Sequence, residues 1–397
     1  MATILFKDRI YTNSKIVRTE ADLASIDSTK VYIIDGEVPI TTSIVVPSGG
    51  LTLLGNGIEL SGLVAAVPNL TMFTGGGNFF ASNMFFDVPT SGSKLFGMTD
   101  PNGTNAVEFN RVNFNNCVSL GYLQGFRQGF ESGTGRFGGT PELEFRGTWS
   151  GGYRMNATYT RGTTDCVLFK AGASFTMASR FYIEMNVNLS TLGVICDFTE
   201  SNLPNKETLE VVNCVVTRGG TYDLNNNASF PNITPVSAKA FFRNNIGLVN
   251  TYIGGINECV TETATTVGAS NTWYDASGVY ICSNLDHFTA NGALPSIIYS
   301  GGTTRRFAIT GGLVLDSNSG NVVNVRFKVF DGTNTTYTPS QRRVINNLQG
   351  ARDVAYFDLF IPITLQGNTT VTLQVMNETA AQDITIEQGS YFTINEI

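Results

Sequence analysis

The chain has 397 residues and a formal net charge of −7 at pH 7. Only 14% of the residues are charged and no Lys/Arg-rich run occurs, so the composition argues against a nucleic-acid partner. No apolar run approaches the roughly 18 residues of a membrane-spanning helix. The first ten residues lack the apolar core of a secretion signal, so we expect synthesis in a cytoplasm and no membrane span.

The first sixty residues predict one short helix followed by short strands. Residues 19–27, TEADLASID, are the best helical candidate, with Thr19 placed to cap about two turns. Residues 30–60 then break into four β-rich runs cut by Gly and Pro: VYIID, SIVVP, LTLLG and IELSG. Asp-Gly and Asn-Gly steps in this segment fit hairpin turns, so local hairpins remain open.

Three bent strand pairs follow, VEFNRVNFNN, LEFRGTWSGG and LEVVNCVVTR, starting at Val107, Leu143 and Leu209. Each begins apolar-Glu-apolar, passes a polar or small corner, and continues with a second apolar pair. Short strands joined by bends predict a parallel β-helix whose bends favour Asn and Gly. We expect these inward side chains: Val107, Phe109, Val112, Phe114, Leu143, Phe145, Trp149, Leu209, Val211, Cys214 and Val216.

The C-terminal part has a different pattern. The Asn-, Ser- and Pro-rich segment 223–237 marks a boundary, and residues 321–397 carry longer alternating strands with polar turns, typical of an antiparallel sandwich. We therefore predict an all-β chain with a β-helix and a jelly-roll β-sandwich. The predicted parts are an N-terminal attachment segment 1–25, a parallel β-helix 26–225, a linker 226–255 and a C-terminal head 256–397.

The opening segment VYIIDGEVPITTSIVVPSGGLTLLGNGIELSG and the three bent pairs resemble the right-handed β-helix of pectate-lyase-like folds, as used in bacteriophage fibres and tailspikes. In the C-terminal part, NTWYD, RRFAITGGLVLDS, VRFKVFDG and GNTTVTLQVMNETAAQDITIE resemble, in that order, the tumour-necrosis-factor-like jelly-roll heads of phage fibres. The second resemblance implies a homotrimer.

Cysteine and histidine usage restricts the chemistry. Six cysteines are scattered without a CxxC spacing, which indicates buried free thiols rather than disulfides or a zinc site. The single histidine, His287, is interpreted as structural. We therefore expect no metal and no cofactor.

Carboxylates are the candidates for catalysis, because tailspikes of the resembled family often cleave polysaccharide. Glycoside hydrolysis needs two carboxyl groups roughly 5–9.5 Å apart. Glu108, Glu144 and Glu210 hold matching positions in the three bent pairs and are expected to face outward along one face. Glu184 and Asp197 complete the set. Solvated surface charge is the favoured interpretation, and a catalytic pair is the alternative.

The Gly-rich segment 121–139 is the candidate for binding. We expect it to leave the coil as a long loop whose aromatic and arginine side chains contact carbohydrate or protein. The alternative is that these side chains cover a coil edge or a trimer interface. The candidate residues are Tyr122, Phe126, Arg127, Phe130 and Arg136, with Trp149 and Tyr153 nearby.

These patterns lead to one functional expectation and two alternatives. The first is a virion structural protein of a tailed phage: a trimeric fibre or spike that contacts other virion proteins through its N-terminus and adheres to a host surface glycan or a virion protein. The second is a tailspike depolymerase that cleaves host polysaccharide. The third is a head decoration protein or head fibre without a receptor role.

Overall fold

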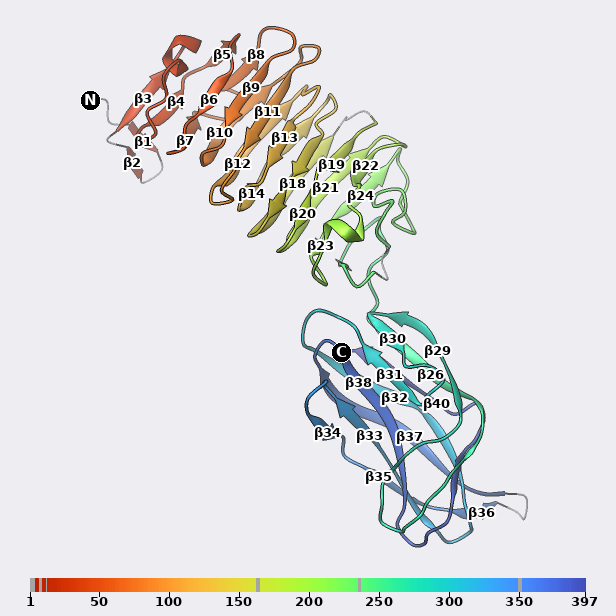
Figure 1. Cartoon of the computed structure of the whole chain (residues 1–397). Coiled ribbons are helices and arrows are strands. Elements are labelled where there is room, and N and C mark those ends of the chain that lie inside the picture. The colour runs from red at the N-terminus through yellow and green to blue at the C-terminus, as the bar shows by residue number, and fades with distance from the viewer. Residues whose placement is uncertain (1–3, 7–8, 12, 162–164, 235–236, 349–351) are drawn as a thin grey trace. The chain divides into compact units, whose positions relative to one another are not determined.

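The computed structural model describes residues 4–6, 9–11, 13–161, 165–234, 237–348 and 352–397, and nearly all of its regular structure is β (Figure 1). The chain forms two compact units. The first comprises residues 1–235 and 239–250, and the second comprises residues 236–238 and 251–397. No helix in the described ranges is long and apolar enough to cross a membrane.

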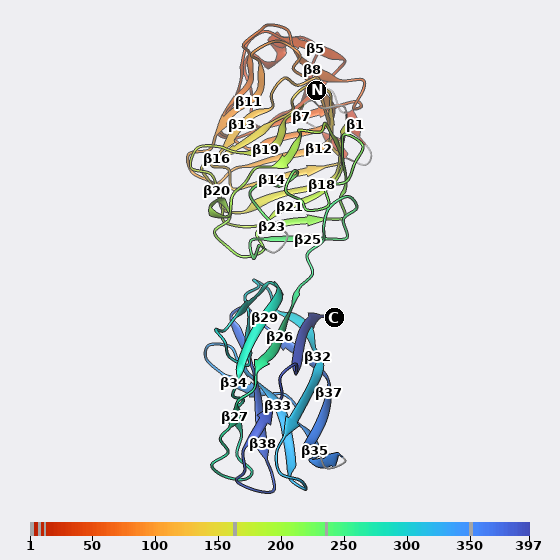
Figure 2. The same ribbon diagram turned by 90° about the vertical axis from the view of Figure 1, so that its right-hand side faces the viewer.

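The first unit is a parallel β-solenoid, as predicted, in which successive coils stack strand on strand (Figures 1 and 2). Its long sheet follows the order β25-β23-β21-β18-β14-β12-β10-β7-β4-β3. These strands are β3 (Ser14–Val17), β4 (Val31–Ile34), β7 (Leu51–Gly55), β10 (Phe79–Asp87), β12 (Ala106–Asn115), β14 (Gln128–Ser132), β18 (Gly152–Arg161), β21 (Phe181–Leu189), β23 (Leu209–Val212) and β25 (Ala240–Arg243).

Shorter strands complete each coil. The long sheet also includes β5 (Glu37–Ile40), β8 (Gly62–Ala65), β15 (Gly135–Phe137) and β24 (Val215–Arg218). A second sheet contains β6 (Ile44–Val46), β9 (Thr71–Gly75), β11 (Lys94–Thr99), β13 (Gly121–Gln124), β16 (Leu143–Arg146), β19 (Val167–Ala171) and β22 (Val194–Cys196). Two small pairs are β17 (Thr148–Trp149) with β20 (Thr176–Met177), and the antiparallel β1 (Ile4–Phe6) with β2 (Arg9–Tyr11).

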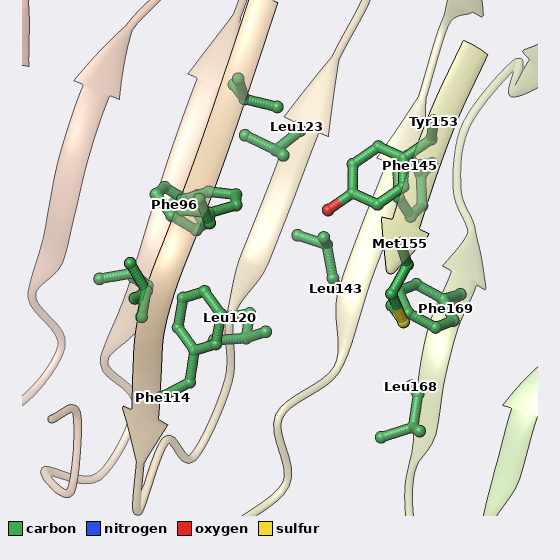
Figure 3. Close-up of a cluster of buried hydrophobic side chains, with 14 of the residues drawn as sticks. Phe96, Phe114, Leu120, Leu123, Leu143, Phe145, Tyr153, Met155, Leu168 and Phe169 are labelled. Atoms are coloured by element: carbon green, nitrogen blue, oxygen red, sulfur yellow. The ribbon is translucent and has the colours of Figure 1, made fainter. Parts of the chain in front are cut away.

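The solenoid core lies between the two sheets. Because side chains alternate along a strand, every second residue of each coil points inward and stacks on its counterpart in the next coil. Aromatic rings meet across the core: the Phe145 ring of the second sheet lies 4.9 Å from Tyr153 and 5.4 Å from Phe181 of the long sheet, centroid to centroid. Figure 3 shows this cluster of buried side chains around Phe145 and Tyr153.

Left-handed residues mark the bends within the coils. Asn83, Asn213 and Asn244 have φ of 51°, 54° and 53°, as expected for a side chain that tolerates this region. In β12, however, Arg111 takes the bend with φ of 54°, not the adjacent Asn110. The alternation explains this: Phe109 and Val112 both point inward, so the extra residue between them must turn the chain.

All the side chains predicted to point inward are buried. The second bent pair is nevertheless not equivalent to the other two, because Leu143 and Phe145 belong to the second sheet. Val107 and Leu209 share a column of the long sheet, which continues to Ala240 of β25. β25 therefore adds a coil within 226–255, which was predicted as a linker.

The predicted N-terminal helix is shorter than expected. η1 is a 3-10 helix over Glu20–Leu23, where the Asp22 carboxylate accepts the Thr19 N–H at 3.1 Å. A second 3-10 turn, η2, covers Glu200–Asn202. The segment predicted for attachment also contains β3, which pairs in parallel with β4 and so contributes to the solenoid sheet.

The second unit is an antiparallel β-sandwich, as predicted. One sheet contains β26 (Gly254–Thr261), β27 (Ala264–Thr265), β29 (Val279–Asp286), β32 (Arg305–Asp316), β36 (Asn346–Leu348), β37 (Arg352–Leu365), β39 (Ile384–Ile386) and β40 (Tyr391–Glu396). The other contains β28 (Tyr274–Asp275), β30 (Phe288–Ala290), β31 (Ser296–Tyr299), β33 (Val322–Phe330), β34 (Thr335–Tyr337), β35 (Gln341–Val344) and β38 (Thr369–Asn377).

The cysteines are free thiols, as predicted, and the single histidine is buried. All six cysteines are free, five of them buried and Cys282 partly exposed. His287 is buried and its Nδ1 lies 2.7 Å from the Asp286 Oδ1. No group of three or more His, Cys, Asp or Glu residues in the described ranges could hold a metal ion.

Candidate functional site

The pairing register of the long sheet places one outward residue of each coil directly beside the next, and we call this row the outer ladder. Aromatic and charged residues alternate along it. Aromatic side chains therefore recur every second coil, roughly 9.5 Å apart, which is about the length of a disaccharide unit. The outer ladder consists of Phe80, Glu108, Phe130, Arg154, Tyr182, Glu210 and Phe241.

The middle of the outer ladder borders a shallow hollow of about 410 Å³, lined from Glu108 to Tyr182. Gly129, Gly151 and Gly152 contribute to its lining. Gly129 is required from inside as well, because a Cβ there would lie 2.2 Å from the Tyr153 ring. Gly129 therefore borders the hollow but is required by the packing of the core.

One end of the hollow is held by two polar contacts around Tyr182. Arg180, which lines the hollow, forms an ion pair with Glu210, and its guanidinium carbon lies 4.9 Å from the Tyr182 ring centroid. The Tyr182 hydroxyl donates to the Glu184 carboxylate at 2.9 Å. Partial burial and this acceptor raise the pKa of Tyr182. The side chains of Arg180 and Tyr182 are thus both bound by carboxylates of the chain itself.

Arg154 differs from Arg180 because its charge is not matched. It is exposed, and its guanidinium carbon lies 5.2 Å from the Tyr182 ring centroid. Among the residues that the structure describes, no side chain forms an ion pair or hydrogen bond with Arg154. The outer ladder therefore presents an uncompensated cation between two aromatic side chains, Phe130 and Tyr182.

Three predicted binding residues are at least partly exposed, in different places. Phe130 lies in the hollow. Arg127 is exposed, and its carbonyl accepts the Gly151 N–H at 2.6 Å, close to the rim. Tyr122 belongs to the second sheet instead, where its ring is half-buried and the Arg146 guanidinium carbon lies 4.0 Å from its centroid.

The other four predicted binding residues, Phe126, Arg136, Trp149 and Tyr153, are buried in the solenoid core, so the prediction of an exposed loop was wrong. Residues 121–139 contain β13, β14 and β15, which are coil strands. Their glycines accommodate tight corners and large neighbouring side chains. Alternation, not polarity, decides which side chains point inward, and the Gly-rich composition concealed the strands.

Arg136 is buried because it pairs inside the core with Glu131 at 2.8 Å, both side chains being at most 1% exposed. Glu131 stacks between Phe109 and Met155 in an inner column. The Thr134 hydroxyl donates to it at 2.9 Å, and the Tyr153 hydroxyl also donates to it. Burial and the Glu131 charge raise the pKa of Tyr153. We call these residues the inner polar cluster.

The five candidate catalytic carboxylates do not form one row. Glu108 and Glu210 share the outer ladder but lie four coils apart, roughly 19 Å. Glu144 belongs to the second sheet, where Arg146 binds it with hydrogen bonds of 2.9 and 2.7 Å. The expectation of three glutamates along one face was therefore wrong, because bent pairs of similar sequence occupy different sheets.

Asp197 and Glu184 complete the set. Asp197 accepts the Ala171 N–H at 2.7 Å, and burial raises its pKa. Glu184 lies diagonally from Glu210 across the parallel β21–β23 pair, two residues beyond the Glu210 partner Tyr182. Of the predicted carboxylates, these two lie on adjacent strands of the same sheet.

Sequence reasoning missed Arg154, Arg180 and Tyr182. Consecutive members of the outer ladder from Glu108 to Glu210 are 22, 24, 28 and 28 residues apart, so no fixed period shows their alignment. The short segment RFYIEMN did display the strand alternation that places Tyr182 and Glu184 on one face.

Comparisons with known proteins do not assign the chain to a family. No protein-family profile and no curated protein matches the sequence. Solved structures similar to part of it include the Eiger TNF protein of S. frugiperda, with 8% identity and a TM-score of 0.28 over 37% of this chain and 92% of that one. Murine APRIL aligns with 9% identity and a TM-score of 0.27 over 37% of this chain and 99% of that one.

Proposed function

We propose that the chain is a virion structural protein of a tailed bacteriophage, a homotrimeric fibre or spike that adheres to a polysaccharide on the host surface. The observation that carries the adhesive role is the outer ladder with its hollow, where aromatic and charged side chains alternate on a rigid sheet. Residues 1–25 serve as the attachment to other virion proteins, and the protein acts in the virion after synthesis in the host cytoplasm.

The chemistry of the outer ladder suits a sugar chain. Aromatic faces stack on the apolar faces of sugar rings, while carboxylate and guanidinium groups bond to hydroxyls. Phe130 and Tyr182 provide such faces, and Glu108 and Arg154 provide the polar groups between and beside them. Because the ladder lies on a hydrogen-bonded sheet, these groups keep a fixed spacing and lose little freedom on binding.

The second unit carries aromatic side chains on an outward face that support trimerisation. Tyr356, Phe360 and Tyr391 are 60%, 69% and 44% exposed. They lie on β37 and β40, the two strands that flank β32. Gly312 of β32 pairs with Tyr391 and has no side chain to cover the surface between these aromatic groups. Exposed aromatic groups of this kind are typical of protein interfaces. We propose that this face packs against copies of the chain.

The virion role is tested by locating the protein and measuring adsorption. Gold-labelled antibodies against the chain should bind at the tail of purified particles, and the isolated protein should compete with phage for adsorption to host cells. Labelling confined to the capsid, without competition, would instead assign it to head decoration and overturn the adhesive role.

The trimer is tested by light scattering coupled to size exclusion. We expect a mass of three times the 42.8 kDa chain. Phe360→Asp should reduce this to the monomer mass. The control is Leu294→Asp, which changes an exposed apolar residue (53% exposed) in the loop between β30 and β31 of the other sheet and should leave the mass unchanged. A wild-type mass of 42.8 kDa at micromolar concentration would contradict the proposal.

A depolymerase is the second candidate, favoured by the diagonal placement of Glu184 and Glu210 next to the hollow. Glu210 is held by Arg180 and Glu184 by Tyr182, so both carboxylates have fixed positions. Reducing ends should then appear when the protein is incubated with host polysaccharide, and both Glu184→Gln and Glu210→Gln should abolish them. Release that survives both substitutions would exclude this pair.

A further inference from the structure

We propose that the outer ladder selects an acidic polysaccharide, with the carboxylate of a uronic-acid or sialic-acid unit bound at Arg154. The inference rests on the proposed adhesion to a glycan and adds the charge of that glycan. It also assigns Arg154 the role of setting specificity, which neither the sequence patterns nor the similar structures indicate.

The distribution of charge around the hollow is the first argument. Arg180 is neutralised by Glu210, and the Tyr182 hydroxyl is occupied by Glu184. Arg154 is the arginine of this group that has no ion pair in the described part of the chain. A ligand that supplies a carboxylate there would gain an ion pair without displacing one that already exists.

The second argument is the shape of the Arg154 guanidinium group. Its planar set of N–H donors can bind a carboxylate with two parallel hydrogen bonds. Its position beside the Tyr182 ring, 5.2 Å from the centroid, restricts the side chain before the ligand arrives. A restricted arginine loses less freedom on binding, and nearby aromatic groups reduce the competition from water.

Glu108 sets the spacing of charge along the ligand. It lies two coils from Arg154, roughly 9.5 Å away, with Phe130 between them. A carboxylate near Glu108 would be repelled, whereas the hydroxyl groups of a neutral sugar would donate to it. The hollow therefore favours a ligand with one acidic unit at Arg154 and a neutral sugar one disaccharide length away at Glu108, with one ring against Phe130.

The test is calorimetric titration of the full chain with a hyaluronan trisaccharide, in which one uronic acid lies between two neutral amino sugars, and with the same trisaccharide after methyl esterification. We expect the acid form to bind at least ten-fold more tightly than the ester. Raising the salt concentration from 50 mM to 500 mM should weaken the acid form and leave the ester unchanged, because salt screens an exposed ion pair.

The matched variants are Arg154→Gln and Arg111→Gln, which remove the same charge from exposed positions of the solenoid. Arg154→Gln should weaken the acid form by roughly ten- to a hundred-fold, the range expected for a charge-assisted hydrogen bond. Arg111→Gln should bind as the wild type does. Unchanged thermal unfolding of both variants would show that neither acts by misfolding.

Several outcomes would overturn the inference. Equal affinity for acid and ester forms would leave adhesion intact and remove the charge selection. Binding of the acid form that survives in Arg154→Gln would place the carboxylate elsewhere. Absence of binding to the acid form at millimolar concentration would remove this ligand class, while the adsorption experiment above would still decide whether the protein adheres.

Discussion

Glu131 and Arg136 show how a single coil can carry charge into an apolar core. Each occupies an inner position beside nonpolar neighbours, Glu131 against Phe109 and Arg136 against Phe114. Their mutual ion pair, with donors from Thr134 and Tyr153, satisfies the carboxylate on all sides. Such a pair contributes little net stability, but either member alone is costly, because one charge is then buried without a partner.

The inner polar cluster gives the first prediction. Arg136→Met should lower the free energy of unfolding by roughly 3–5 kcal/mol, because it leaves the Glu131 carboxylate buried and unpaired. The double variant Glu131→Leu with Arg136→Met should recover most of that loss, since both charges are then absent. Chemical denaturation of the three proteins measures the difference. Equal losses in the single and double variants would refute the coupling.

The second prediction concerns Gly129, which lines the hollow and also contacts the core. A Cβ at this position would lie 2.2 Å from the Tyr153 ring, so Gly129→Ala must push a packed ring aside. We expect a loss of roughly 1–3 kcal/mol in the free energy of unfolding. Gly57→Ala is the control, because its added Cβ meets nothing closer than 3.4 Å. Similar stability of both variants would contradict this account.

At the scale of the elements, strand alternation and bends determine which side chains of the solenoid point inward. The sequence pattern was sufficient to predict the inward side chains of β12, because Val107, Phe109, Val112 and Phe114 alternate with polar residues. It was not sufficient for β14 and β15, because their inward positions include Glu131 and Arg136. A charged residue can point inward only if its partner does, and that partner becomes visible only once the coil is folded.

The bend of β12 gives the third prediction. Arg111 occupies the left-handed region with φ of 54°, where Asn is tolerated and a β-branched residue is strained. Arg111→Val should therefore lower the free energy of unfolding by about 1–2 kcal/mol, and Arg111→Asn should leave it unchanged or raise it slightly. Thermal unfolding of the two variants separates backbone strain from loss of the arginine charge, which both share.

The same reasoning explains which parts of the candidate site were predictable. Glu108 could be proposed because it stands in a segment whose alternation is clear, whereas Phe130 was proposed as part of a loop and lies in strand β14. Arg154 could not be placed beside them, since the coils differ in length and the alignment follows from backbone pairing across coils. Composition suggested a loop at 121–139, but glycine serves equally in coil corners.

At the scale of the whole molecule, the two units have separate cores. The continuous cluster of buried nonpolar side chains in the solenoid runs from Val17 to Leu248 and includes no residue of the sandwich. A unit with its own core can unfold on its own. We expect differential scanning calorimetry to show two transitions, and Arg136→Met to lower the temperature of one of them alone. A single transition that shifts as a whole would contradict this independence.

Thiol reactivity tests the packing of both units together. Burial raises the pKa of Cys214 to about 12 and raises those of Cys117 and Cys196. Because the thiolate is the reactive form, raised pKa values keep these groups protonated and inert at pH 8. A thiol-reactive disulfide should label at most Cys282 in the native chain and all six cysteines in denaturant. Rapid native labelling of several cysteines would indicate a loosely packed core.

The inner polar cluster has one more consequence, which concerns how the coils find their order. Neighbouring coils present similar nonpolar faces, so a growing stack could join the wrong coils, or coils of two chains, with little loss of contact area. Glu131 and Arg136 come from strands of the same coil and need their own neighbours as donors and ring partners. We infer that this pair specifies which coils stack on each other. A misaligned stack would bury one charge without its partner and would therefore be unstable.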